Sequence, residues 1–145
     1  MIPDLVEIGG PWKVLPPGVH DARISEARVR FATNDVRRSL CEGFERGCAS
    51  LRGAGCGAVY LDGSYVTEKA TPGDFDACWD PHGVDRSLLD PVLLDFRDRR
   101  RAQKAKYGGE FFPSSIRADS MQTFLEYFQV DRYTGKRKGI VRIIL

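Results

Sequence analysis

Two short segments define the centre of this sequence: Leu61-Asp62-Gly63-Ser64 and, after nine residues, Asp74-Phe75-Asp76-Ala77. The residues from Ala58 to Leu61 form a short apolar run between glycines, which predicts a buried strand that ends in Gly-Ser. Polar and apolar residues then alternate from Asp74 to Trp79, which predicts a second strand with both aspartates on one face. The sequence therefore predicts two strands that bring a Gly-Ser turn near a pair of carboxylates.

The chemistry of these two parts is complementary. Glycine lets a backbone approach a ligand closely, and the serine offers a hydroxyl and an N–H group to a phosphate. Two neighbouring carboxylates repel each other, and a divalent cation such as Mg²⁺ neutralises them while it also binds phosphate oxygens. The pattern is typical of a site for phosphoryl or nucleotidyl transfer.

Helical periodicity flanks this motif. Apolar residues at helical spacing predict a helix from about Asn34 to Arg52, capped by Thr33 or Asn34. In this helix Val36 is expected in the apolar stripe and Arg37 on the solvent side. Asp90-Pro91 predicts the start of a second helix, which carries the basic run from Arg97 to Lys106. Further along we expect a strand at 110–112, a helix at 120–128 and a strand at 140–145.

This order of elements predicts a single α/β (α+β) domain over residues 1–145, with a small mixed sheet flanked by helices. Regular βα repeats are too few for a doubly wound sheet. The first twenty residues are rich in glycine and proline, so residues 1–30 are expected to form an irregular N-terminal arm. The basic stretch Lys136-Arg137-Lys138 is expected to be an exposed turn before the last strand.

Length and composition agree with one ordinary domain. The 145 residues, 42% of them hydrophobic, can bury a single core, and the net charge of +2 excludes a strongly basic nucleic-acid-binding coat. No apolar run approaches the ~20 residues of a membrane span, and no signal peptide is visible, so we expect a cytoplasmic protein without membrane contact. The four cysteines lack zinc-site spacing and are expected to be reduced and mostly buried.

The central motif resembles the signature of the nucleotidyltransferase superfamily, typified by DNA polymerase beta and kanamycin nucleotidyltransferase. That signature is Gly-Ser or Gly-Gly after a hydrophobic residue, a gap, and then Asp-x-Asp. Gly63, Ser64, Asp74 and Asp76 match it, whereas Asp62 stands where the family usually has a hydrophobic residue. Most of the chain is similar to a small, poorly characterised bacterial branch of minimal nucleotidyltransferases. The stretches that carry this similarity are LPPGVH at 15–20, LDGSYVTEK at 61–69, PGDFDACWD at 72–80 and KGIV at 138–141.

The resemblance implies a nucleotidyltransferase core and a Mg²⁺- or Mn²⁺-dependent transfer of a nucleoside monophosphate from an NTP to an acceptor hydroxyl. The acceptor is an RNA, a protein or a small molecule. Asp74 and Asp76 would hold the metal, and Gly63 and Ser64 would grip the β- and γ-phosphates. Lys69 is expected either at the triphosphate or as an ordinary solvated lysine.

The family also implies a third carboxylate on a neighbouring strand, which acts as general base and completes a metal site. Glu110, in the short strand after the second helix, is the preferred candidate. Asp95 is the alternative, but its segment is predicted to be helical, so its side chain is expected to face solvent.

Two other functions stay open from the sequence. The first is a non-catalytic or regulatory module of this fold that acts with a protein partner in a toxin–antitoxin or mobile-element defence pair. The second is a plain RNA-binding protein that uses the basic run from Arg97 to Lys106.

Overall fold

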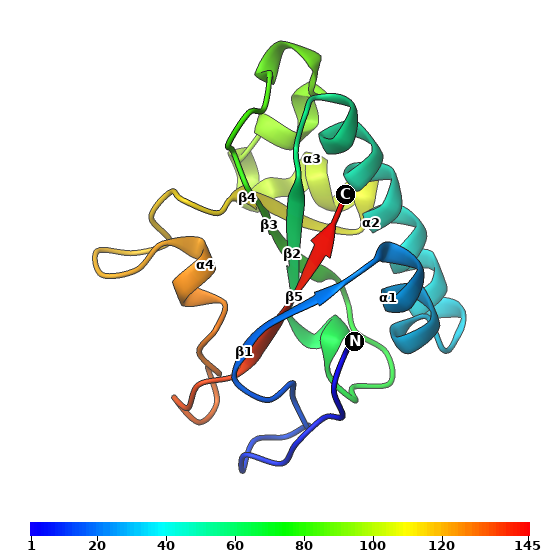
Figure 1. The fold of residues 1–145 in the computed structure, drawn as a ribbon, viewed down its shortest axis with the longest axis vertical. Helices are drawn as coiled ribbons and strands as arrows, with labels where there is room; N and C mark the ends of the chain where they lie inside the picture. Colours follow the sequence, from blue (N-terminus) through cyan, green and yellow to red (C-terminus); the bar gives the residue numbers. More distant parts are fainter.

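The computed structural model describes all residues from Met1 to Leu145. It is an open, mixed, five-stranded sheet with the strand order β1-β5-β2-β3-β4, together with four α-helices (Figure 1). The strands are β1 (Gly18–Ala22), β2 (Ala58–Asp62), β3 (Phe75–Trp79), β4 (Gly109–Pro113) and β5 (Gly139–Ile144). The helices are α1 (Ile24–Phe31), α2 (Asp35–Gly53), α3 (Arg97–Tyr107) and α4 (Phe124–Tyr127). The predicted α+β class with a small mixed sheet is confirmed.

Strand pairing sets which side chains share a face. β2 runs antiparallel to β3, with Asp62 opposite Asp76, and β3 runs parallel to β4, with Asp76 opposite Glu110. Residues directly opposite in neighbouring strands point to the same face of a sheet. Asp62, Asp76 and Glu110 therefore form a row of carboxylates across three adjacent strands.

The main core lies on the opposite face from this row. There α2 packs Phe44, Cys48 and Leu51 against the strands, and β3 contributes Phe75, Ala77 and Trp79. Figure 1 shows α1 and α2 together on this side of the sheet and α4 on the other. The predicted alternation in β3 is thus confirmed, because its apolar residues enter the core and its aspartates face away.

A smaller apolar cluster covers part of the face that carries the carboxylates. It consists of Cys78, Phe112, Phe128 and Ile140, with partly buried residues of the α4 segment packed against it. Segment 120–128, predicted as one helix, contains only the single turn of α4. A capping box between Thr123 and Glu126 begins that turn.

The long helix is confirmed, but two of its residues lie where the sequence did not predict them. α2 begins after Asn34, whose side chain accepts the N–H of Arg37 at 2.9 Å, as expected of an N-cap. Val36 is exposed, and Arg37, expected in solvent, is only 4% exposed. Its guanidinium is buried because it donates to backbone carbonyls of the loop that follows β2, a distant partner that periodicity within the helix cannot reveal.

The prediction of an irregular arm over residues 1–30 is wrong beyond residue 17. Residues 18–22 form β1, which pairs in parallel with β5, and residues 24–31 form α1, which buries Ala27 and Phe31. The partner of β1 lies more than a hundred residues away along the chain, at Gly139–Ile143, so no local pattern identifies this short strand. Residues 1–17 contain no helix or strand and form a single isolated β-bridge, between Val6 and Val14.

The helix predicted from Asp90 is divided into two pieces. Asp90 caps a short 3-10 turn at Pro91–Leu94, and α3 begins only at Arg97. Three consecutive residues near its start, Asp98 to Arg100, have φ between 49° and 61°, which is the left-handed region. The regular right-handed part of α3 therefore starts after Arg100.

The cysteines lie as the sequence predicts. Cys41, Cys48, Cys56 and Cys78 are all free and buried. Burial raises the pKa of Cys48 and Cys56, which keeps these thiols protonated and unreactive. None of the helices has both the length and the hydropathy that crossing a membrane would require.

Close packing of α2 on α3 gives a first testable expectation. A Cβ atom on Gly43 would lie 1.8 Å from the carbonyl oxygen of Tyr107. Gly43→Ala should therefore lower the free energy of unfolding by roughly 2–3 kcal/mol, because overpacking forces the two helices apart. Urea denaturation would measure this. Gly53→Ala, where a Cβ meets nothing within 4 Å, is the matched control and should leave stability unchanged or slightly raised. Equal effects of the two substitutions would contradict the close contact.

Candidate functional site

Three carboxylates meet at the junction of β3 and β4. One carboxylate oxygen from each of Asp74, Asp76 and Glu110 lies within 4.8 Å of the other two. The parallel register places Glu110 directly beside Asp76, and Asp74 immediately precedes β3. The predicted adjacency of the two strands and the shared face of the two aspartates are both confirmed.

Asp95, the alternative third carboxylate, lies outside this cluster. It is in the linker between the 3-10 turn and α3 rather than in a helix, so its predicted helical location is wrong. The Asp95 carboxylate accepts hydrogen bonds from the backbone N–H of Arg97 at 3.1 Å and from the Arg97 guanidinium at 3.0 and 2.9 Å. The hydrogen bonds from Arg97 lower the pKa of Asp95 to about 2, so it remains a charged turn residue.

The electrostatics of the cluster favour a bound cation. Burial, and then the charges of Asp74, Asp62 and Glu110, raise the pKa of Asp76 to about 7. Burial and the charge of Glu110 also raise the pKa of Asp74. Three partly buried, mutually repelling carboxylates offer hard oxygen donors at short separation, which fits Mg²⁺ or Mn²⁺.

Glu110 already has two protein cations beside it. Its carboxylate lies 3.3 Å from Arg100 Nη2 and 3.0 Å from Lys104 Nζ, both on α3. Arg100 is further held by the ring of Phe112, 5.4 Å from its guanidinium carbon. The side of the cluster that faces α3 is therefore compensated by the protein itself.

Asp62 is a fourth carboxylate whose role sequence reasoning missed. It is only 3% exposed, and Lys138 Nζ lies 3.1 and 3.2 Å from its two oxygens. Burial raises the pKa of Asp62, while Lys138 opposes that effect. Lys138 was expected in an exposed turn, yet it is the counter-ion for a charge at the end of a buried strand. The sequence did contain a signal for this pair, because an acid at the end of a buried strand requires a cation nearby.

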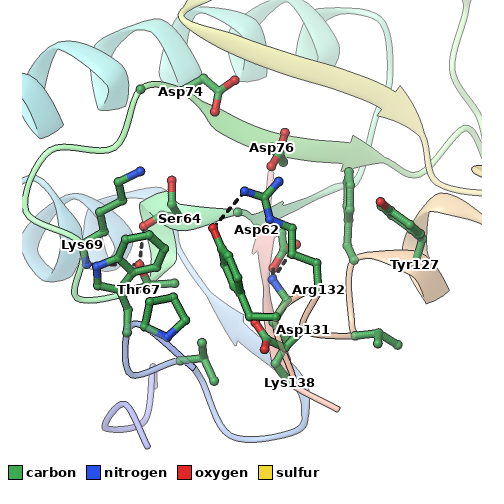
Figure 2. A pocket seen from close by; sticks show the side chains of 18 of the residues that line it. Asp62, Ser64, Thr67, Lys69, Asp74, Asp76, Tyr127, Asp131, Arg132 and Lys138 are labelled. Carbon is green, nitrogen blue, oxygen red and sulfur yellow. Dashed lines mark hydrogen bonds and ion pairs between the residues drawn. The ribbon is translucent and has the colours of Figure 1, made fainter. Parts of the chain in front are cut away.

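Gly63 is required where it stands. Its φ is 81°, and a Cβ would lie 2.6 Å from Asp76 Oδ2, so only glycine allows the backbone to pass beside that carboxylate. Ser64 then begins a short 3-10 turn, Ser64–Val66, and its carbonyl accepts the hydroxyl of Thr67 at 2.6 Å. Figure 2 shows the side chain of Ser64 in the space below Asp74.

The loop that carries Ser64 and Lys69 is fixed by the buried Arg37. The guanidinium donates to the carbonyls of Tyr65 at 2.7 Å, Thr67 at 2.8 Å and Lys69 at 3.1 Å. One side chain of α2 thus satisfies several carbonyls of a loop that belongs to no strand ladder. It also fixes this loop to the first turn of α2.

The Gly-Ser turn and the aspartates open into a cavity of about 540 Å³ (Figure 2). Gly63, Ser64, Lys69, Asp74 and Asp76 all line it, so these five predicted site residues are brought together. Glu110 does not line it and reaches the aspartates from the side of α3. Asp62, Thr67 and Gly73 complete this side of the lining. The other walls come from the N-terminal arm and the segment before β5: Pro11, Trp12, Val14, Gln122, Tyr127, Phe128, Val130, Asp131, Arg132, Tyr133 and Lys138.

Sequence reasoning predicted Lys69 in this site but missed the residues that accompany it. Lys69 Nζ lies 4.8 Å from the centroid of the Trp12 ring, and the guanidinium carbon of Arg132 lies 4.9 Å from that of Tyr133. Trp12, Arg132 and Tyr133 come from segments far from Lys69 in the sequence, and none belongs to a recognisable motif. Only the fold shows that they share one cavity with the carboxylates.

The raised pKa of Asp76 has a measurable consequence for the protein without metal. An unfolded aspartate titrates near pH 4, so between about pH 4 and 7 the folded state binds more protons than the unfolded state. The contribution of Asp76 to the free energy of unfolding therefore falls as pH rises through this window. Asp76→Asn removes the titrating group. Relative to wild type, its free energy of unfolding should therefore be more favourable at pH 8 than at pH 5, by on the order of 1–2 kcal/mol.

Urea unfolding with EDTA at the two pH values would measure this difference. Asp95→Asn is the control. The pKa of Asp95 is lowered, so the ionised carboxylate stabilises the fold at both pH values, and this substitution should lower the free energy of unfolding at both. An effect of Asp76→Asn that is the same at pH 5 and pH 8 would show that Asp76 titrates normally.

Comparison with known proteins identifies a family but no relative of known activity. No curated protein and no solved structure matches the chain. Residues 11–144 match DUF6932, described as a family of unknown function. The matched range includes all five strands and every residue that lines the cavity. The chain therefore belongs to the DUF6932 family.

Proposed function

We propose that this protein is a Mg²⁺-dependent nucleotidyltransferase that transfers a nucleoside monophosphate from an NTP to an acceptor hydroxyl. One observation carries the proposal. Gly63-Ser64, which matches a phosphate-gripping turn, opens into the same cavity as Asp74 and Asp76, whose carboxylates lie within 4.8 Å of Glu110. The volume of about 540 Å³ is within the range of small-molecule sites.

The residues divide the work between metal and phosphate. Asp74, Asp76 and Glu110 would hold the divalent cations through carboxylate oxygens. When bound, Mg²⁺ supplies charge neutralisation to the carboxylates and to the phosphates. Gly63 leaves room for the phosphates beside Asp76, and Ser64 donates its hydroxyl to a β- or γ-phosphate oxygen. Lys69, directed toward Asp74 in Figure 2, adds positive charge on the same side.

Glu110 acts on the acceptor. It takes the proton of the acceptor hydroxyl, and that oxygen attacks the α-phosphorus and forms a new P–O bond. The bond from the α-phosphorus to the oxygen that bridges to the β-phosphate breaks, and pyrophosphate leaves with that electron pair. The proton stays on Glu110 until it passes to water.

A second candidate is a regulatory module that binds the nucleotide without turnover and acts through a protein partner, as in a toxin–antitoxin or mobile-element defence pair. The ion pairs of Glu110 with Arg100 and Lys104 favour it, because they occupy the carboxylate that would serve as base. Either function fits a cytoplasmic location, where NTPs are abundant and buried free thiols stay reduced.

The metal requirement can be tested by calorimetric titration with each NTP. Wild-type protein should bind NTP at least about tenfold more tightly with Mg²⁺ or Mn²⁺ than with EDTA, because the metal neutralises the carboxylates that face the phosphates. Asp74→Asn combined with Asp76→Asn should abolish this dependence. Asp95→Asn should keep it, since Asp95 lies outside the cluster. Equal wild-type affinity with and without metal would overturn the proposal.

Turnover can be tested by incubation with α-³²P-labelled NTP, Mg²⁺ and host lysate. We expect label to enter an RNA, a protein or a small molecule. Glu110→Gln should reduce the rate by about 10²–10⁴ while NTP affinity stays close to wild type, because the base acts on the acceptor. Asp95→Asn should retain the wild-type rate.

One outcome separates the two candidate functions, and another tests the role of Glu110. Metal-dependent NTP binding with no label transfer would favour the regulatory module. A wild-type rate in Glu110→Gln would remove Glu110 as the base.

A further inference from the structure

The wall opposite the carboxylates contains two cation–aromatic pairs in contact with each other. The Lys69 ammonium lies over the Trp12 ring, at 4.8 Å, and the Arg132 guanidinium lies over the Tyr133 ring, at 4.9 Å. Arg132 also donates a hydrogen bond of 2.9 Å to the Tyr133 hydroxyl. The two rings meet edge to face, with centroids 5.8 Å apart and planes at 75°. Four side chains thus form one unit in the order cation, ring, ring, cation.

Each segment that carries this unit is held in place. Arg132 and Tyr133 lie in a turn whose Asp131 carboxylate, 6% exposed, accepts the N–H of Thr134 at 2.8 Å and its hydroxyl at 2.7 Å.

The other two segments are joined to each other. The N–H of Lys13, next to Trp12, donates to the Glu68 carboxylate at 3.1 Å, which links the N-terminal arm to the loop of Lys69. That loop is fixed in turn by Arg37. The relative positions of the two pairs therefore follow from the fold and not from the surface side chains alone.

Lys69 and Arg132 differ from the other cations near the site. Lys138, Lys104 and Arg100 each form an ion pair with a carboxylate of the row. Lys69 and Arg132 form no ion pair, and aromatic rings hold them instead.

Both cations are directed toward the aspartates, Lys69 toward Asp74 and Arg132 toward Asp76 (Figure 2). Both cations line the same cavity as Asp74 and Asp76, which places them near the metal-binding end. They are the positive charges in the cavity that remain free for an anion.

We propose that Lys69 and Arg132 form a clamp for the polyphosphate of a metal-bound nucleotide, and that Trp12 and Tyr133 position these cations. The inference rests on the proposed function, because the clamp faces the carboxylates that would hold the metal. Arg132 offers paired N–H donors to phosphate oxygens and Lys69 a compact charge. Cation–π contact keeps each cation directed into the cavity at little desolvation cost. The clamp recognises polyphosphate, so inorganic tripolyphosphate is a ligand as well as NTP.

Calorimetry with Mg²⁺-ATP and Mg²⁺-tripolyphosphate tests the coupling of Trp12 to Lys69. Lys69→Met and Trp12→Leu should each lower the affinity for both ligands by about tenfold, the usual effect of losing a charged contact to phosphate. The double variant should bind no more weakly than Lys69→Met, since Trp12 acts through Lys69. Trp12→Phe should keep most of the affinity because it preserves an aromatic face. Additive losses in the double variant would overturn the positioning role. A loss for ATP but not for tripolyphosphate would show that Trp12 stacks on the base instead.

Arg132→Gln tests the second cation against Arg137→Gln, an exposed arginine nearby that does not line the cavity. Arg132→Gln should weaken both ligands by about tenfold and reduce the salt dependence of binding, whereas Arg137→Gln should change neither. Wild-type affinity in both Arg132→Gln and Lys69→Met, beside metal-dependent ATP binding, would refute the clamp and leave the proposed function intact. If neither ligand binds the wild-type protein with metal, the proposed function fails together with the clamp.

Tryptophan fluorescence gives a readout that a purely structural role would not change. The chain has two tryptophans, and Trp79 is fully buried in the core, so a ligand-induced change reports on Trp12. Tripolyphosphate has no ring to stack, yet it should alter the Trp12 emission because its negative charge changes the electric field of the Lys69 ammonium that lies over the indole. Trp12→Phe should remove this change. Unchanged emission at saturating tripolyphosphate would contradict the cation–π contact with Lys69.

Discussion

Repulsion among the carboxylates on one face of the sheet is the constraint on which the rest of the site depends. Strand register aligns Asp62, Asp76 and Glu110 across β2, β3 and β4, and Asp74 joins them from the residue before β3. The protein compensates the two ends of this row, at Asp62 with Lys138 and at Glu110 with basic residues of α3. The aspartates in the middle form no ion pair, and burial together with the neighbouring carboxylates raises the pKa of Asp76 to about 7. The charge balance of the fold is thus incomplete at one point, beside the cavity. A divalent cation at that point would complete it.

Two close contacts convert this electrostatic arrangement into a shaped site. Gly63 lets the chain turn directly beside the Asp76 carboxylate, so the loop starts within reach of any ligand of the aspartates. Arg37 then fixes the same loop to α2 through carbonyls at three positions. Since α2 also packs on the sheet through Phe44, the loop, the helix and β3 form one rigid unit. The cavity wall that faces the phosphates is therefore as well fixed as the core, although it consists of loop residues.

The parts of the fold that could be predicted are those that local pattern specifies. Alternation identified β3 and put Asp74 and Asp76 on one face, and turn residues identified the strand that ends at Gly63. The adjacency of Glu110 was predictable because the family resemblance requires a third carboxylate on a neighbouring strand. What could not be predicted depends on contacts between distant segments. The pairing of Asp62 with Lys138 spans 76 residues, and the burial of Arg37 requires a loop about 30 residues further along the chain.

The position of β1 shows the same limit. A five-residue strand at a sheet edge has too little internal pattern to be distinguished from an irregular arm, and its partner β5 lies at the other end of the matched sequence. Trp12, Arg132 and Tyr133 of the cavity walls could not be predicted either, because each is an ordinary residue until distant segments converge. Sequence reasoning therefore identified the reacting end of the site and Lys69, but not the rest of the opposite wall.

The pairing of β5 between β1 and β2 also sets an order of assembly during synthesis. A ribosome releases β2, β3 and β4 with their acidic residues well before β5 emerges, and β1 has no strand to pair with until then. Lys138 immediately precedes that strand, so Asp62 has no counter-ion until β5 is made. Until then the β2 edge of the β2-β3-β4 fragment is unpaired, and β1 has no partner strand. Insertion of β5 closes the gap between the strands and supplies the missing charge in one event, so the step that completes the sheet also completes the binding site.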